Sequence, residues 1–278
     1  MKKANIIKAI PFLILFVTTL IFLIPFIWTS LTSLKLDKEI YTNSMIIFPS
    51  QIYFGHYVKL FTNMDNFTMY FYNSVVITFF SVSATVLFSA MMGYAFGVLK
   101  FAGKKIYLFF ILLILTLPYA IYLIPIYILE DAANLIDTRI AIILPYIALN
   151  LPLSILIMRG TFKNIPTELV ESATIDGCNF IQAWSRIMMP IAKSGIAIVI
   201  ILTFINSWGE FMFARTLSFT PNSQTLSVGI TFLRDEASSW QYGTLCSAIT
   251  VALIPLLIIF LSMQKYFIKG IVEGALKG

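Results

Sequence analysis

Three polar side chains that could bind a ligand lie close together inside one apolar run of the sequence. They are Asn206, Trp208 and Glu210. An ionisable side chain inside a membrane usually faces the interior of a helix bundle or a watery path. A Trp and a long acid near the end of a span are also typical of the membrane boundary, where the carboxylate reaches back to water. The cluster therefore has two interpretations, the lining of a solute path and an interfacial belt.

Tyr119, Tyr122 and Asn150 are further candidates for the lining of a path. They lie beside prolines in two other apolar runs. Proline removes a helix hydrogen bond, and nearby polar groups or water must satisfy the freed carbonyl. Tyrosine near a membrane boundary is ordinary, however. The single histidine, His56, is isolated, and no residue set has metal-ligand or nucleophile–base spacing. The sequence therefore predicts no metal site and no catalytic residues.

The longest polar break in the sequence spans residues 159–193. Within it, Gly177 can adopt the left-handed conformation that ends a helix. Asn179 and Gln182 have the spacing of a capping box, which predicts a second helix start. We expect two short helices joined at Gly177, the second ending before Pro190. Such a unit could project into water as a compact knob, or lie on the membrane surface as an amphipathic hairpin.

The composition predicts a membrane protein with several spans. The chain has 278 residues, of which 59% are hydrophobic, and its mean hydropathy is +0.90, too apolar for a soluble domain. Long uncharged runs without the alternation of a barrel favour helices. The fifth run reaches full length only if Glu210 is tolerated within it. The six expected helices are 10–33, 73–99, 106–129, 140–158, 195–217 and 243–264.

The basic residues predict the orientation of these helices. With the N-terminus inside, most Lys and Arg side chains, but few acids, lie on the cytoplasmic side, as the positive-inside rule requires. We therefore expect a multi-pass protein of the cell (inner) membrane with both termini cytoplasmic. The net charge of +6 reflects this topology and does not indicate nucleic acid. The apolar start is longer than a signal peptide's core and is expected to stay as the first span.

The pattern of the polar break resembles the cytoplasmic coupling loop of ATP-binding-cassette (ABC) importer permeases, usually written EAA-x3-G-x9-I-x-LP. Ser172 stands where that pattern has its second Ala, and Met189 stands in place of Leu. The resemblance favours the projecting knob and implies that its motif residues contact an ATPase. These residues are Glu171, Ser172, Ala173, Asp176, Gly177, Ile187 and Pro190.

Other segments are similar to the carbohydrate branch of that family, in particular the smaller permease subunit of maltose-type importers. Asn73-Ser74, Gly93-Tyr94-Ala95-Phe96 and the C-terminal tail carry this resemblance. The segment 206–210 resembles the W-N-[DE] region of sugar permeases, with Gly209 replacing Asn. In this family the tail lies at the ATPase dimer, which implies such a contact for Gly274 and Lys277.

The resemblance implies an all-α fold of six transmembrane helices, a type I ABC importer core with one preceding helix. We expect one membrane domain, 1–278, with the core at 70–265, the coupling segment 159–193 between the fourth and fifth helices, and a tail at 266–278. The implied function is half of a translocation pathway for a sugar, most simply an oligosaccharide. The implied partners are a second homologous permease, a cytoplasmic ATPase dimer, an extracellular sugar-binding protein and membrane lipid.

Three alternatives to sugar import remain open. The coupling pattern does not select a solute, so an ABC permease for a polyamine or phosphate fits it as well. A secondary transporter would use intramembrane charges, of which Glu210 is the one example. A membrane enzyme would need a catalytic set. The sequence has no G-x4-GK[ST] phosphate loop, so no cofactor is expected in this chain, and ATP with Mg²⁺ would bind a partner ATPase.

Overall fold

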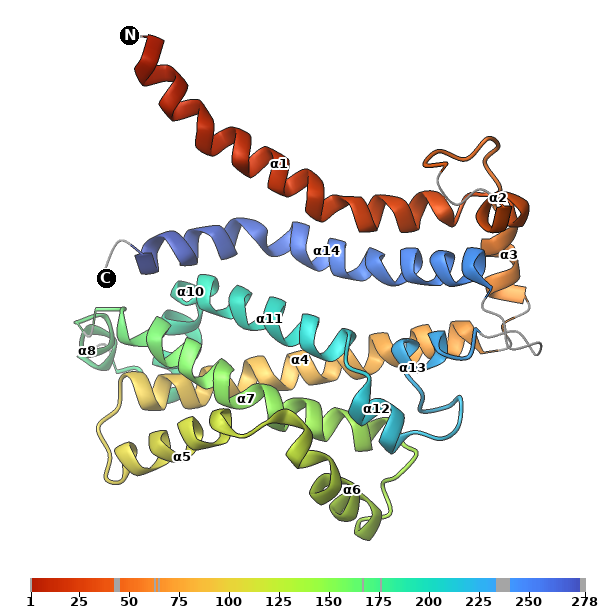
Figure 1. Ribbon diagram of the computed structural model, residues 1–278. Helices are drawn as coiled ribbons and strands as arrows, with labels where there is room; N and C mark the ends of the chain where they lie inside the picture. The colour runs from red at the N-terminus through yellow and green to blue at the C-terminus, as the bar shows by residue number, and fades with distance from the viewer. Residues whose placement is uncertain are drawn as a thin grey trace. The chain divides into compact units, whose positions relative to one another are not determined.

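The computed structural model describes residues 2–42, 46–62, 64, 66–166, 168–175, 177–233 and 241–275. Residues 2–10, 173–174 and 267–275 are described by their backbone alone. The described ranges contain helices and loops but no strand. Figure 1 shows the order of the helices along the chain.

The helices up to residue 132 are α1 (Lys2–Thr32), α2 (Asp37–Thr42), α3 (Gly55–Thr62), α4 (Phe67–Gly97), α5 (Lys104–Thr116), the short 3-10 turn Tyr119–Tyr122 and α6 (Leu123–Ala132). The remainder are α7 (Arg139–Lys163), α8 (Glu168–Ile175), α9 (Phe180–Gln182), a π-helical turn (Ala183–Met188), α10 (Met189–Ile191), α11 (Lys193–Trp208), α12 (Met212–Leu217), α13 (Leu226–Ile230) and α14 (Tyr242–Ala275).

Contacts divide the chain into two compact units. Unit 1 comprises Met1–Phe67 and Gly229–Ile254, and unit 2 comprises Thr68–Val228 and Pro255–Gly278. The helix α14 therefore begins in one unit and ends in the other. Unit 1 contains α1 to α3, and unit 2 contains α4 to α13 except for the ends that fall at the boundaries.

Four helices are long and apolar enough to cross a membrane, namely α1, α4, α7 and α14. They confirm four of the six expected spans. Two further pairs, α5 with α6 and the segment Phe180–Ile191 with α11, pass the same test only together, and they are bent by 102° and 79°. By length and composition, the described residues thus contain four to six candidate spans.

The third expected helix, 106–129, is wrong as a continuous element. The helix α5 ends at Thr116, and Leu117 is extended, with φ −81° and ψ 135°. Pro118 explains this break, because a proline disfavours helical geometry at the residue before it and offers no N–H of its own. The hydroxyl of Tyr122 then donates to the carbonyl of Ile114 at 3.0 Å, which ties the two sides of the break together.

The fifth expected helix, 195–217, is also wrong as a continuous element. The helix α11 ends at Trp208, and α12 begins after a break at residues 209–211. Glu210 accepts hydrogen bonds from the amides of Phe213 at 2.9 Å and Ala214 at 3.0 Å. These are amides of the first turn of α12, which have no partner inside the helix. The acid expected inside a helix therefore caps the start of the next one.

The helix that follows Gly177 continues beyond the expected end. We expected it to stop before Pro190, but α10 includes Pro190 and ends at Ile191. A proline inside an α-helix clashes with the carbonyl four residues earlier. The preceding π-helical turn, in which the amide of Met189 bonds to the carbonyl of Trp184, has the wider register that relieves this clash.

The core of unit 2 forms where α4, α7 and α11 pack together. Tyr94 of α4, Met158 of α7 and Val199 of α11 are members of one buried cluster. At Gly93, an added Cβ would lie 2.4 Å from the Cβ of Met158. Only glycine allows α4 and α7 to approach this closely, as small residues do between helices in membranes.

Polar side chains at the starts of α4 and α7 fasten the loop 218–225. Asn73 donates to the carbonyls of Pro221 at 2.9 Å and Gln224 at 2.8 Å, and accepts from Arg139 Nε at 2.8 Å. Asp137 Oδ1 accepts from two amides of the loop, 2.8 and 2.9 Å away, and from the hydroxyl of Ser223. The loop is therefore anchored to both helix starts.

The Asp137 anchor predicts a dependence of stability on pH. Partial burial raises the pKa of this carboxyl, but the Ser223 hydroxyl and two amides outweigh burial and lower the pKa from 3.8 to about 2. Because the pKa is lower in the folded protein, the stabilisation is present above pH 3.8 and is lost as the pH falls towards 2.

We expect Asp137→Asn to lower the free energy of unfolding by about 1 kcal/mol near neutral pH, since a neutral oxygen accepts more weakly than a charged one. Thermal unfolding in detergent between pH 6 and pH 3 measures the effect, and the difference between variant and wild type should shrink with acid. Asp131→Asn, at an exposed position, is the matched control. A constant difference across that range would contradict the assignment.

Candidate functional site

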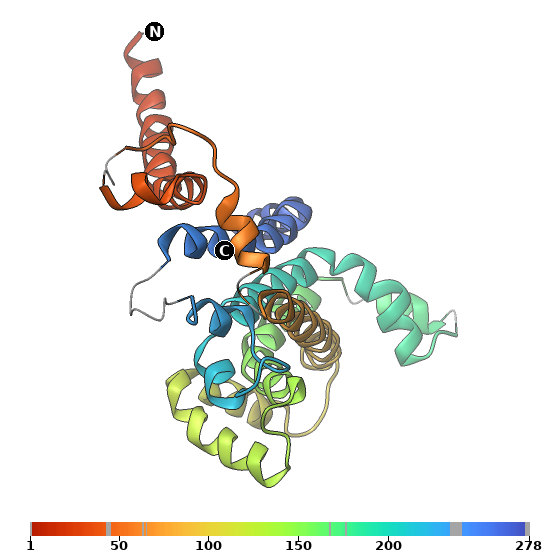
Figure 2. The ribbon, with the colours of Figure 1, turned by 90° about the vertical axis from the view of Figure 1, so that its right-hand side faces the viewer.

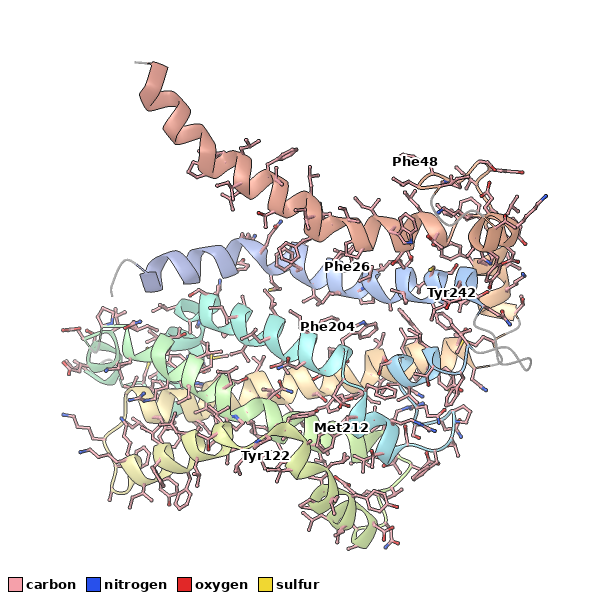
Figure 3. The ribbon with its side chains drawn as sticks, viewed as in Figure 1. Phe26, Phe48, Tyr122, Phe204, Met212 and Tyr242 are labelled. Carbon is pink, nitrogen blue, oxygen red and sulfur yellow. The ribbon has the colours of Figure 1, made fainter. Side chains whose placement is uncertain are left out.

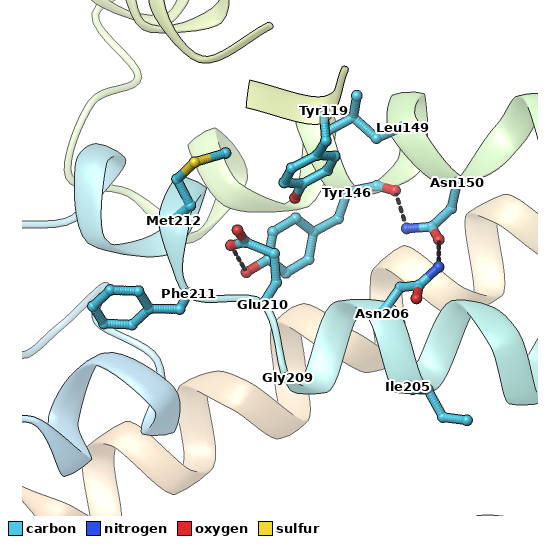
Figure 4. A pocket seen from close by; sticks show the side chains of 10 residues that line it. All are labelled: Tyr119, Tyr146, Leu149, Asn150, Ile205, Asn206, Gly209, Glu210, Phe211 and Met212. Atoms are coloured by element: carbon cyan, nitrogen blue, oxygen red, sulfur yellow. Dashed lines mark hydrogen bonds between the residues drawn. The ribbon is translucent and has the colours of Figure 1, made fainter. Parts of the chain in front are cut away.

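A cavity of about 630 Å³ opens in unit 2 where α11 ends (Figure 4). Its walls come from the 3-10 turn, α7, α11 and the break before α12. Volumes of 300–1,000 Å³ are typical of small-molecule sites. The lining residues are Tyr119, Tyr146, Leu149, Asn150, Ile205, Asn206, Gly209, Glu210, Phe211 and Met212.

Glu210 is fixed by donors from two helices. Its Oε2 accepts from the hydroxyl of Tyr146 at 2.7 Å, in addition to the two amides of α12. Its backbone carbonyl accepts from the hydroxyl of Ser227 at 2.6 Å. With three donors on the carboxylate, this acid is held rigidly at the edge of the cavity and joins α7 to α12.

Two amide side chains form a hydrogen-bonded row along the cavity. Asn206 Nδ2 donates to Asn150 Oδ1 at 2.9 Å, and Asn150 Nδ2 donates to the carbonyl of Tyr146 at 2.7 Å (Figure 4). Asn206 is exposed, and Asn150 is half-buried. Each side-chain amide can still form further hydrogen bonds, because it has two N–H donors and an oxygen with two lone pairs.

Aromatic surface completes the site. Tyr119 and Phe211 are each 43% exposed, and the ring of Tyr119 packs edge-on against Phe213, with centroids 4.9 Å apart. Apolar faces beside amide and hydroxyl groups suit a ligand that has both C–H surfaces and hydroxyls. Among the lining residues, Glu210 is the one charged side chain.

The structure places four of the six candidate path residues in the cavity, namely Tyr119, Asn150, Asn206 and Glu210. Trp208 is not in the lining: its ring is 9% exposed and stacks on Phe204 at 5.5 Å. Tyr122 (Figure 3) lies at the end of the 3-10 turn that follows the break after α5, and its hydroxyl donates to the carbonyl of Ile114 in that helix.

Sequence reasoning missed Tyr146, which positions Glu210. The signal that could have found it is its place one helical turn before Asn150, because residues four apart share a face. Its hydroxyl meets Glu210, 64 residues later, and no local pattern predicts such a contact.

We expect Glu210→Gln to destabilise α12. In the wild type, each carboxylate oxygen accepts from a backbone N–H. In either orientation of the Gln side chain, its NH₂ group would replace one of these oxygens and face an N–H donor without an acceptor. The expected loss is about 1–3 kcal/mol, read as a lower midpoint of thermal unfolding in detergent. Tyr146→Phe, which removes one donor and leaves both amides bonded, should cost less. Equal stability of Glu210→Gln and wild type would contradict the cap.

The coupling segment has the expected local geometry. Gly177 has φ +82° between α8 and α9, which confirms the left-handed turn. Asn179 accepts from the amide of Gln182, and Gln182 accepts from the amide of Asn179, both at 2.9 Å, which confirms the capping box. Figure 2 shows this segment projecting from the other helices of unit 2.

Part of the coupling segment packs on other helices of unit 2. The ring of Phe180 lies 5.2 Å from that of Tyr94 in α4, and Met188 is buried with Phe162 of α7 in one cluster. The segment is therefore seated on the ends of α4 and α7.

The other side of the coupling segment is exposed and apolar. Ile175 is 86% exposed, Ile181 67% and Leu169 42%. The side chain of Ser172 donates to the carbonyl of Glu168 at 2.8 Å, which keeps this hydroxyl within its own helix. Exposed apolar side chains on a projecting segment are typical of a surface that contacts a partner.

The remaining predicted contact residues are placed as follows. Glu171 and Pro190 are exposed, and Ile187 is half-buried. Ala173 lies in α8 and Gly274 in α14, each described by its backbone alone. Asp176 and Lys277 lie outside the described residues.

A helical membrane bundle with a projecting segment between two spans and a polar cavity defines a class of transport subunits, and comparison with known proteins agrees. Residues 86–273 match the family described as the binding-protein-dependent transport system inner membrane component. The chain belongs to this family of ABC importer permeases. It is a transport subunit and not an enzyme.

Curated relatives align along nearly the whole chain. A putative ABC transporter permease of Caldicellulosiruptor sp. (strain Rt8B.4) is 34% identical over 96% of each protein. The arabinooligosaccharides transport system permease of Bacillus subtilis is 32% identical over 94% of this chain and 92% of its own. The sulfoquinovosyl glycerol transport system permease of Agrobacterium fabrum is 30% identical, over 92% and 89%.

A solved structure shows the same fold. It is that of a bacterial ABC transporter involved in the import of the acidic polysaccharide alginate, and one of its chains superposes with a TM-score of 0.84. The match covers 96% of this chain and 98% of the other, at 21% identity. The all-helical importer-permease fold expected from the sequence is thereby confirmed, with four to six candidate spans.

Proposed function

We propose that this chain forms half of the translocation pathway for an uncharged oligosaccharide. The observation that carries the proposal is the 630 Å³ cavity, which is lined by two amides, exposed aromatic rings and a single carboxylate. Sugar hydroxyls can pair with amides in both directions, and the C–H face of a sugar ring can lie against Tyr119 or Phe211.

The charge in the cavity favours a neutral solute over an acidic one. No Lys or Arg is among the lining residues, and the carboxylate of Glu210 is already held by three donors. A uronate or phosphate would meet this carboxylate without a compensating cation, which is unfavourable at short range in a low-dielectric site. The named substrates of several relatives, arabinooligosaccharides and galactooligosaccharides, also favour an oligosaccharide.

The partners belong to the same proposal. A second, homologous permease supplies the other half of the path, and a cytoplasmic ATPase dimer binds ATP with Mg²⁺ and docks on the exposed apolar side of the coupling segment. The tail, including Gly274 and Lys277, extends to that dimer. A binding protein delivers the sugar from outside, and both termini are cytoplasmic. The projecting apolar surface at Ile175 and Ile181 supports the docking.

Reconstitution tests the proposal. The chain is placed in proteoliposomes with its second permease and ATPase, and the binding protein is added with labelled solutes. We expect saturable, ATP-dependent uptake of a neutral oligosaccharide, and no ATP hydrolysis by the chain alone. Uptake of a uronate oligosaccharide or a polyamine in place of the neutral sugar would overturn the assigned solute class. Hydrolysis by the isolated chain would overturn the division of labour.

A further inference from the structure

A second cavity, of about 350 Å³, lies in unit 1 at the end of α1, beside the start of α14. Nothing in the transport function accounts for it. The lining residues are Trp28, Thr32, Lys35, Ile40, Tyr41, Tyr242 and Cys246. All of these residues belong to the same unit.

The cation in this cavity is unusually buried. Lys35 is 2% exposed, whereas lysines at the ends of membrane helices normally extend the ammonium into water. Its Nζ donates to the carbonyl of Ile46 at 2.5 Å and lies 4.8 Å from the centre of the Trp28 ring. Among the described residues, no carboxylate forms an ion pair with it. An ammonium group has three donors; one of them is used here, and the carboxylate of Glu39, whose charge interacts with Lys35, forms no close ion pair with it.

A second buried polar group, the hydroxyl of Thr32, has no hydrogen-bond partner among the described residues. Thr32 is 8% exposed, and its hydroxyl makes no hydrogen bond with the described residues. Thr32 and Lys35 are three residues apart at the end of α1, and both line the cavity. A buried hydroxyl without a partner, close to a buried ammonium with spare donors, costs free energy unless an anion accepts hydrogen bonds from both.

The scaffold holds Lys35 in place independently of any ligand. His56, which is 1% exposed, bonds to the backbone carbonyl of Lys35 at 2.8 Å. The ring of His56 packs so closely on α14 that a Cβ at Gly243 would lie 2.2 Å from it. The cavity is therefore a built feature of unit 1.

The position of the cavity indicates what fills it. Before Trp28, α1 is an apolar run whose large side chains are exposed, as in a helix that faces lipid. The first charged residue after this apolar run is Lys35, and Tyr41 and Tyr242 are 57% and 48% exposed. Aromatic side chains at such a transition mark the membrane–water interface, and the anion available at that level is the phosphodiester of a phospholipid.

We propose that this cavity binds the phosphodiester group of a membrane phospholipid. Lys35 Nζ and the hydroxyl of Thr32 donate to its non-bridging oxygens, and the aromatic rings contact the glycerol and the first methylene groups. Binding involves no covalent step. The lipid seals the junction between the end of α1 and the start of α14.

Native mass spectrometry of the full-length chain, purified with its transporter subunits in a neutral detergent, tests the site. The probes are phosphatidylglycerol, diacylglycerol with the same acyl chains, and soluble glycerol phosphate. We expect Lys35→Met to lower the apparent affinity for phosphatidylglycerol about tenfold or more, the effect of losing a charge-assisted hydrogen bond. Lys35→Arg should retain binding, and so should Lys38→Met, an exposed matched control on the same segment.

Thr32→Val keeps the test decisive if Lys35→Met does not fold. Val has the shape of Thr without its hydroxyl, so in the absence of lipid the variant should be as stable as the wild type or more stable. With phosphatidylglycerol its affinity should fall several-fold. Unchanged phosphatidylglycerol binding in Lys35→Met or Thr32→Val would overturn the proposal. Equal binding of diacylglycerol would do so as well, and displacement by equimolar glycerol phosphate would assign the site to a soluble anion instead.

Discussion

The substitution Gly177→Asp is expected to abolish uptake while the protein still inserts and assembles. Gly177 has φ +82°, and a side chain there would meet no atom within 4 Å. The substitution therefore destabilises the fold only by the strain of a left-handed residue, about 1 kcal/mol. The new carboxylate, however, lies beside the exposed apolar side chains of Ile175 and Ile181, and burying it against a partner without a cation is costly.

Gly177→Asn is the matched control for this prediction. Asparagine has nearly the same size as aspartate, carries no charge and tolerates the left-handed conformation better than most residues. We expect it to retain a substantial part of the uptake. Uptake and co-purification of the ATPase are measured for both variants in proteoliposomes. Normal transport by Gly177→Asp would show that the segment does not contact the ATPase.

Gly209→Phe is expected to block the cavity and lower uptake at least about tenfold, equivalent to about 1.4 kcal/mol. Gly209 has φ −92°, which any residue can adopt. A Cβ there would lie 3.4 Å from the nearest atom, the carbonyl oxygen of Ile205. The position lines the cavity, so the benzyl group can occupy it with little strain on α11.

The comparison with Gly209→Ala separates blockage from damage to the fold. Alanine removes the same glycine but leaves most of the volume, so its uptake should stay near that of the wild type. Basal ATP hydrolysis by the assembled transporter should be similar in both variants, because the length of α11 separates Gly209 from the coupling segment. If Gly209→Phe transports the sugar normally, the cavity does not lie on the pathway.

The features that could be predicted from the sequence are those determined by residues close together in the chain. Helices α1, α4, α7 and α14 follow from long apolar runs, and the turn at Gly177 follows from the special freedom of glycine. The capping box of Asn179 and Gln182 needs only residues three apart. In each case the deciding interaction lies within one helical turn or one uninterrupted run.

Breaks within apolar runs could not be predicted in the same way. A proline such as Pro118 can kink a span or end it, and hydropathy is the same in both cases. The break at Glu210 depends on the amides of α12 and on the hydroxyl of Tyr146, which comes from another helix. The cavity exists because of this break, so its full lining, including Tyr146, needed the tertiary structure.

The anchor at Asn73 has a consequence for biosynthesis. Its amide is buried, with 0% exposure, yet the carbonyls that it binds lie 148 and 151 residues later in the chain. At roughly 5–20 residues per second, a ribosome needs about 7–30 s to supply them. During that interval the side-chain amide of Asn73 in the nascent α4 lacks these two hydrogen-bond acceptors. The insertion machinery or a neighbouring water must satisfy this group until Pro221 and Gln224 have been synthesised.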